Sequence, residues 1–158
     1  MPIKSNYRIK GDMDGKITEL AQMIRESNSI VFYGGAGVST ESGVKDYRSE
    51  DGLYNTVKEY GVSPEEILSH DFFVRDPKTF YDFYRNYFLC DAKPNAAHFA
   101  LAELEKMDKL KAVITQNIDG LHQAAGSKNV LELHGTVKKY YCSGCGCDCG
   151  DVSPIISA

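Results

Sequence analysis

A short apolar segment followed at once by glycines sets the strongest limit on the fold. Residues 30–33 read Ile-Val-Phe-Tyr, rich in the β-branched and aromatic side chains typical of strands, and Gly34 and Gly35 end the segment abruptly. Similar apolar segments occupy residues 112–115 and 130–133. Helical patterns separate the three segments, and parallel strands need such crossovers. The sequence therefore predicts an α/β fold with a Rossmann-like parallel sheet and a helical insertion.

Helix start signals place the helices between these strands. Apolar residues at helical spacing predict a first helix over about residues 14–26. Ser63, Asp76 and Asn95 stand where helix caps are expected, and the first two are followed by proline, which suits the first helical position. The helices that they open form an insertion after the first strand. In the third of them we expect three buried side chains, Phe99, Ala102 and Met107.

Length and charge narrow the class of protein. The chain has 158 residues, enough for one domain, and its 18 basic against 22 acidic residues give a net charge of −4. A nucleic-acid binder needs clustered basic residues, so we expect no direct nucleic-acid partner. No apolar run approaches the roughly 18 residues of a membrane span, and the first residues show no signal peptide. We expect a cytoplasmic protein without a membrane partner; the oligomeric state stays open.

The glycine-rich segment after the first strand is a candidate phosphate site. Gly34, Gly35 and Gly37 would let a ligand approach the backbone, and a helix beginning there would offer unpaired N–H groups to an anion. The spacing does not match the usual G-x-G-x-x-G pattern. A tight structural turn is therefore the alternative interpretation.

Polar side chains also follow the other two strands, where ligands collect in open α/β sheets. Gln116, Asn117 and Asp119 come after the second strand, and His134 comes after the third. The residues after the second strand are either turn-forming groups or ligand contacts. An imidazole can take a proton near neutral pH, so His134 is a candidate general base. The other three histidines are interpreted as packing or surface residues: His70, His98 and His122.

Several motifs occur together in one order. They are GAGVSTESGVKDYRS (35–49), PNAAH (94–98), TQNIDGLHQAAG (115–126) and LHG (133–135), with a Cys-x-x-Cys beyond them. In these motifs the chain resembles the sirtuin family, and its bacterial members most closely, from about residue 15 to 145. The resemblance implies an NAD-dependent protein-lysine deacetylase that transfers the acyl group from lysine to ADP-ribose and releases nicotinamide. NAD would be consumed, and acetylated lysines in proteins would be the partners. The alternative is a catalytically inactive truncated sirtuin fragment that binds NAD or ADP-ribose weakly or acts through partner association.

The resemblance also implies roles for residues of these motifs. His134 would be the base that activates a ribose hydroxyl, Asn117 would share the catalytic site, and Asp119 would hold the carboxamide of nicotinamide. Tyr47 stands where the family has phenylalanine, and Lys45 where it has proline. The cofactor-binding residues implied are Ala36, Gly37, Ser39, Thr40, Asp46, Tyr47, Arg48, Gln116, Asn117, Ile118, Asp119 and His134.

One helix bears on the acyl group. A sirtuin branch that removes acidic acyl groups carries Tyr-x-x-Arg on the helix that follows Asp76 here. This chain has Tyr81 and Arg85 one residue farther apart, with Asp82 between them. Because Asp82 would repel a carboxylate, we expect a preference for uncharged acyl groups such as acetyl.

The last cysteines depart from the family pattern. Four of the five lie in CSGCGCDC, residues 142–149, which in a reducing compartment indicates metal ligation before disulfides. A zinc ribbon has two Cys-x-x-Cys pairs about 15–20 residues apart, too far for the chain after Cys145. We expect Cys142 and Cys145 to be ligands of a partial zinc site, after a strand at 138–141. A four-thiolate site here would need a tightly wrapped loop.

These observations predict one incomplete domain over residues 1–158. Residues 14–135 would form the first half of the NAD-binding domain, and 136–150 a partial zinc module. Residues 151–158 would be an atypical tail. A full dinucleotide fold uses two three-stranded halves, so we expect the second half of the sheet to be missing.

Overall fold

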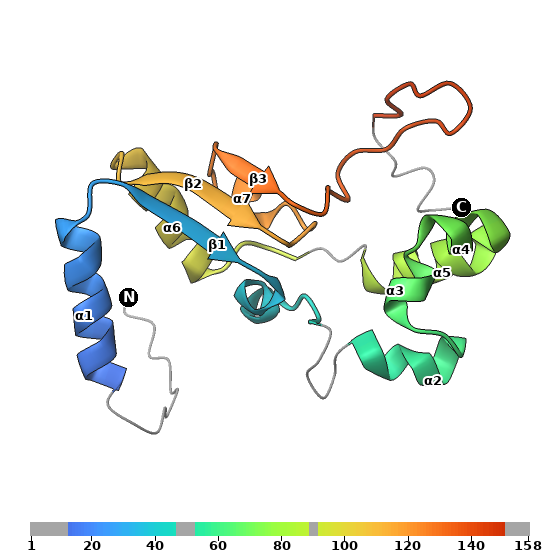
Figure 1. The fold of residues 1–158 in the computed structure, drawn as a ribbon, viewed down its shortest axis with the longest axis horizontal. Coiled ribbons are helices and arrows are strands. Elements are labelled where there is room, and N and C mark those ends of the chain that lie inside the picture. The colour runs from blue at the N-terminus through green and yellow to red at the C-terminus, as the bar shows by residue number, and fades with distance from the viewer. Residues whose placement is uncertain (1–12, 47–52, 89–91, 151–158) are drawn as a thin grey trace.

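A three-stranded parallel sheet organises the protein (Figure 1). The computed structural model describes residues 13–46, 53–88 and 92–150. Strands β1 (Ile30–Gly34), β2 (Leu110–Thr115) and β3 (Val130–Glu132) lie in the order β1-β2-β3. In the register Val31 lies beside Ala112, and Ile114 beside Leu131. The predicted parallel α/β sheet is confirmed.

Helix α1 (Met13–Glu26) precedes the sheet, where the periodicity predicted it. Its last carbonyl groups lack partners within the helix, as at every helix end. The ammonium of Lys109, the residue just before β2, donates to the carbonyl oxygens of Ile24, Arg25 and Ser27 over 2.8–3.0 Å. A cation also suits the negative end of a helix, so Lys109 fixes α1 to the sheet.

The insertion after β1 is a helical unit with its own core, beside the sheet in Figure 1. A 3₁₀ turn at Leu53–Thr56 leads into α2 (Val57–Tyr60), α3 (Pro64–Ile67), α4 (His70–Arg75) and α5 (Pro77–Tyr87). Ile67, Phe72 and Phe83 form its buried centre. The starts predicted for α3 and α5 are confirmed, whereas α4 was not predicted.

Helices α6 (Ala96–Lys106) and α7 (Leu121–Ala124) pack on each other, and α6 packs on β2. Phe32 and His122 are in contact, with ring centroids 6.0 Å apart, and Val113 is buried on the same face of the sheet. In α6, Ala102 is buried as expected. The expectation for Phe99 and Met107 is wrong, because they are 50% and 63% exposed. The buried face of α6 instead includes His98, at the third position of the helix.

The opposite face of the sheet is open within the described ranges. Side chains alternate along a strand, so Val31 and Tyr33 share this face with Leu131 and Leu133. All four are more than half exposed. The described part of the sheet therefore has one covered and one uncovered apolar face.

The glycine-rich segment after β1 forms two 3₁₀ turns, Ala36–Val38 and Thr40–Ser42, and not the helix that the sequence predicted. The N–H groups of Val38 and Ser39 bind the carbonyl oxygens of Gly35 and Ala36 within the first turn. Such a short turn lacks the summed dipole of a helix. The basis we gave for phosphate binding at a helix end is thus corrected.

None of the helices in the described ranges combines the length and the apolar composition that crossing a membrane requires.

Candidate functional site

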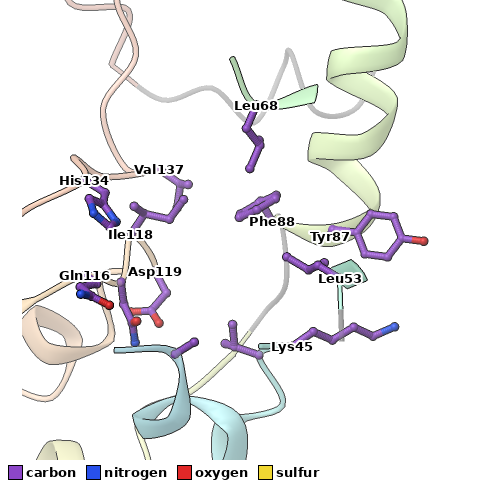
Figure 2. A pocket seen from close by; sticks show the side chains of 13 residues that line it. Lys45, Leu53, Leu68, Tyr87, Phe88, Gln116, Ile118, Asp119, His134 and Val137 are labelled. Atoms are coloured by element: carbon purple, nitrogen blue, oxygen red, sulfur yellow. The ribbon is translucent and has the colours of Figure 1, made fainter. Parts of the chain in front are cut away.

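A cavity of about 360 Å³ lies at the carboxyl ends of the three strands, facing the helical insertion (Figure 2). Each strand is followed by residues that line it, as expected at this edge of a parallel sheet. The lining residues are Ala36, Val44, Lys45, Leu53, Leu68, Tyr87, Phe88, Gln116, Asn117, Ile118, Asp119, His134 and Val137.

Three polar side chains form one network at the sheet side of the cavity. The Ser39 hydroxyl is fully buried and donates to Asp119 Oδ2 over 2.7 Å. Asn117 Nδ2 donates to Ser39 Oγ over 2.9 Å, and the N–H of Leu121 donates to Asp119 Oδ1. The network fixes Asp119 and Asn117 beside the cavity. It also engages the hydroxyl of Ser39, which the resemblance implied as a cofactor-binding residue.

Two buried histidines lie behind this network. The rings of His98 and His122 are 4.7 Å apart, and both side chains are almost fully buried. Burial lowers the pKa of each, and the nearby Asp119 carboxylate opposes this only in part. His98 Nδ1 accepts the N–H of Asn95, which caps α6. These rings act as neutral packing groups, as the sequence interpretation expected.

Gln116 and His134 lie at the rim, both exposed. A second hollow of about 490 Å³ adjoins the cavity there and shares Ala36, Gln116 and His134 with it. Gly37 and Asp46 line that hollow. Together, the cavity and the hollow collect all but four of the implied cofactor residues. Thr40 is exposed, with its hydroxyl on the Gly37 carbonyl, Ser39 lies in the buried network, and Tyr47 and Arg48 fall outside the described residues.

Sequence reasoning missed the apolar wall of the cavity. In Figure 2, Leu53, Leu68 and Phe88 project from the insertion toward Ile118 and Asp119. Val44 and Val137 extend this wall. Leu53 differs from an ordinary loop residue only in being 2% exposed. That burial is known only once the chain has folded. The sequence held no local signal for these positions.

The helix α5 presents different residues to the cavity than the sequence suggested. Tyr87 and the residue that caps the helix, Phe88, line it, whereas Tyr81, Asp82 and Arg85 do not. The Tyr60 hydroxyl donates to Asp82 Oδ2 on the surface of the insertion. The argument that Asp82 repels an acidic acyl group at the site is therefore wrong.

The cysteine segment folds as a small hairpin and not as the strand predicted at 138–141. A single antiparallel bridge joins Tyr141 and Asp148. The backbone N–H of Cys147, followed by the thiols of Cys147 and Cys142, lowers the pKa of the Cys145 thiol. Across the described ranges, no three His, Cys, Asp or Glu side chains are already gathered closely enough to hold a metal ion. The donor set itself, four free thiols, suits a thiophilic ion such as zinc.

Comparison with known proteins gives a consistent family. The model of the Sir2 family, the sirtuins, matches residues 35–153. A protein of Clostridium acetobutylicum named NAD-dependent protein deacetylase is 58% identical over 132 residues, which is 83% of this chain and 54% of that protein. A protein of the same name from Clostridium perfringens is 57% identical over 134 residues, covering 84% and 55%. The chain thus spans about half the length of these curated relatives.

Solved structures agree. A structure determined in work on the mechanism and regulation of Sir2 enzymes superposes with a TM-score of 0.77 at 43% identity, covering 92% of this chain and 56% of that one. A Sir2 structure with a deacetylated p53 peptide and 3′-O-acetyl ADP-ribose gives a TM-score of 0.74 at 42% identity, with 84% and 52% covered.

Proposed function

The chain belongs to the Sir2 family, and from this membership and its cavity we propose that it carries the catalytic half-site of an NAD-dependent protein-lysine deacetylase. The observation that carries the proposal is a cavity that joins polar groups after β2 and β3 to an apolar wall. Curated relatives at 57–58% identity bear the name of that activity. Acetylated lysines in proteins are the substrates we propose.

The polar side of the cavity suits the nicotinamide ribose of NAD. The Ser39 hydrogen bond holds Asp119 in place, and this carboxylate can accept from a carboxamide. Asn117 and Gln116 supply amides at the same strand end, and Ile118 an apolar contact. Ala36 and Gly37 leave the backbone near the rim open to phosphates, with Asp46 beside them. We also propose Tyr47 and Arg48, which lie outside the described residues, as contacts of the cofactor.

His134 is the residue we propose as general base. His134 follows β3, is exposed, and lines both the cavity and the adjoining hollow. Its imidazole can therefore contact a ribose hydroxyl that lies in either space. An imidazole can act as a general base near neutral pH. NAD supplies the activated ribose bond that the acyl oxygen attacks. The residues of the chain position that bond and accept the proton.

The apolar wall supports a preference for uncharged acyl groups. Leu53, Leu68 and Phe88 offer no partner to a carboxylate, and burying an unpaired charge there would be costly. Lys45 also borders the cavity, but Figure 2 shows its side chain running away from it. Its ammonium lies 5.6 Å from the centre of the Tyr87 ring. We therefore retain the proposed preference on a different basis than Asp82.

Metal and location complete the proposal. Cys142 and Cys145 are the zinc ligands we propose, and the ion would have a structural role, stiffening the hairpin. The free cysteines suit a reducing compartment, which supports a cytoplasmic location.

The test is release of nicotinamide from NAD by the purified chain with an acetylated lysine peptide. We expect release that requires the peptide and falls at least about 100-fold in His134→Ala, the range of general-base catalysis. His70→Ala, at an exposed histidine far along the insertion, serves as the matched control. No release from a chain that is folded by circular dichroism and binds ADP-ribose would contradict the proposal and favour a binding-only role.

A further inference from the structure

The cavity lies between two units that come from different parts of the chain. On one side is the sheet with the segment that follows β3, and on the other is the helical insertion with the end of α5. Val137 lines the cavity from the first side and Phe88 from the second, and Figure 2 shows them facing each other across it. The space that a ligand meets therefore depends on the contacts that hold the two units together.

A pair of tyrosines joins the two units. The hydroxyl groups of Tyr84, in α5, and Tyr140, in the segment after β3, lie 2.8 Å apart in a hydrogen bond to which either group can donate. The two rings meet edge to face, with centroids 6.4 Å apart and an angle of 85° between the planes. Both side chains are partly buried, so this hydrogen bond is stronger than one in open water.

Each of these tyrosines is connected to the lining of the cavity. The Tyr84 ring stacks on the Phe88 ring, one turn further along the chain, with centroids 5.9 Å apart and planes 18° apart. On the other side, the N–H of Val137, three residues before Tyr140, donates to the Ile118 carbonyl over 3.0 Å. Phe88, Val137 and Ile118 all line the cavity. The bond between the two tyrosines thus links the two sides of its lining.

Lys45 supplies a second contact between the units. It lies in the segment that leads from β1 to the insertion, and its ammonium is 5.6 Å from the centre of the Tyr87 ring. A cation over the face of an aromatic ring is attracted to it. The Tyr87 hydroxyl donates to Glu59 Oε2 over 2.8 Å, and its ring centroid lies 5.0 Å from that of the buried Phe83. Tyr87 is therefore fixed within the insertion and gives Lys45 a well-placed partner.

We propose that Tyr84, Tyr140 and Lys45 are positioning residues for the acyl-lysine substrate. Their two contacts near the end of α5 hold the insertion at the distance from the sheet that the cavity requires. Neither Tyr84 nor Tyr140 lines the cavity, so they act through Phe88 and Val137. Loosening either contact lowers the affinity for the substrate and leaves the chemical step, on the sheet side, nearly unchanged. The inference rests on the proposed function for the identity of the ligand only.

The test compares conservative variants of the full chain. Tyr140→Phe removes one hydroxyl and keeps the ring, and Tyr141→Phe, at the neighbouring residue that is 60% exposed, is the matched control. Amide hydrogen exchange of residues 84–88 and 134–140, followed by mass spectrometry, reports the docking of the two units without any ligand. Nicotinamide release at a series of concentrations of an acetylated lysine peptide gives KM and kcat.

We expect Tyr140→Phe to exchange faster in both segments and to raise KM for the peptide about 5-fold, the effect of one lost hydrogen bond, with kcat nearly unchanged. Tyr84→Phe/Tyr140→Phe should be no worse than Tyr140→Phe alone, because it leaves no hydroxyl unpaired. Lys45→Met keeps the apolar stem without the charge and should raise KM about 3-fold. The control Tyr141→Phe should behave as the wild type.

Three results would overturn the inference. They are wild-type exchange in Tyr140→Phe, faster exchange with an unchanged KM, and a loss that falls on kcat instead of KM. A wild-type chain that releases no nicotinamide would count against the proposed function alone. In that case the exchange measurement still tests the docking, and the dissociation constant of the peptide, measured by calorimetry, takes the place of KM.

Discussion

Ser39 shows how one buried hydroxyl organises the candidate site. It donates to Asp119 and accepts from Asn117, and these two residues lie two positions apart on the segment after β2. Ser39→Ala would leave the carboxylate and the amide short of a partner in a partly buried place. We expect a loss of about 1–3 kcal/mol in the free energy of unfolding, measured by urea denaturation.

Thr40→Ala is the matched control for this change. Thr40 is the next residue and is exposed, and its hydroxyl donates to the nearby Gly37 carbonyl. Its replacement should change stability by less than about 0.5 kcal/mol. Equal losses in the two variants would show that the network around Ser39 contributes nothing beyond the turn itself.

The pair of His98 and His122 predicts how stability depends on pH. Burial lowers both folded-state pKa values below the unfolded value near 6.5, so between the two values the unfolded chain binds more protons. Stability is therefore complete above about pH 6.5 and is lost as the pH falls below it. The slope is up to about 1.4 kcal/mol per pH unit for each proton taken up.

Urea denaturation at a series of pH values checks this dependence. The variant His98→Asn/His122→Phe removes both titrating rings. In this variant the free energy of unfolding should depend less steeply on pH between about pH 5 and 6.5, just below the unfolded-state pKa of about 6.5. His70→Gln, at an exposed histidine, should keep the slope of the wild type. A wild-type slope in the double variant would assign the pH dependence to other groups.

Single residues of the site were predictable where the signal was local. Gln116, Asn117 and Asp119 follow a strand directly. The parallel sheet alone therefore brings them to the carboxyl ends of the strands, where the cavity lies. Leu53 and Phe88 reach the same cavity from a helical unit that packs independently of the sheet. Their position depends on how two units dock, which no spacing along the chain encodes.

Among the helices, α6 joins the covered face of the sheet to the glycine-rich turns. Asn95 caps α6 by accepting from the N–H groups of Ala97 and His98, and its side-chain amide donates to the Val38 carbonyl over 2.7 Å. Asn95→Ala removes both functions and should cost about 1 kcal/mol or more of stability. Asn95→Asp keeps the cap but loses the donor to Val38.

The two variants separate helix stability from loop placement. We expect Asn95→Asp to unfold near the wild-type urea midpoint, yet to bind ADP-ribose more weakly in calorimetry, because Val38 lies in the turn between Gly37 and Ser39. Asn95→Ala should be impaired in both measurements. Wild-type binding by Asn95→Asp would show that the Val38 contact does not place the turn.

Two helix starts that the sequence predicted, at Ser63 and Asp76, share a physical cause. Ser63 and Asp76 each accept the N–H three residues ahead, a contact within one turn that sequence alone determines. Helix α4 has the same signal, since Ser69 accepts from Phe72, but it follows α3 so closely that no loop separates them in the sequence. The error at Phe99 arose because helical spacing does not say which face of α6 meets the sheet.

At the scale of the whole molecule, the sheet has one covered and one exposed apolar face, and this difference governs how the chain associates. Parallel strands are apolar on both sides because such sheets are normally covered on both. Here α6 and α7 cover one side, and the other exposes Val31, Tyr33, Leu131 and Leu133. Contiguous apolar surface of this kind drives association. The purified chain should therefore show an apparent mass that rises with concentration in sedimentation analysis.

Charges on that face should suppress the association. Val31→Lys/Leu131→Lys places one cation on each outer strand of the open face, where side chains already meet solvent and folding has little to lose. Val57→Lys, on α2 in the helical insertion, adds a charge at another exposed apolar position and should leave the association unchanged. If the sheet variant associates like the wild type, another surface is responsible. If the sheet variant is monomeric and keeps its circular dichroism spectrum, the open face of the sheet is the surface through which the chain associates.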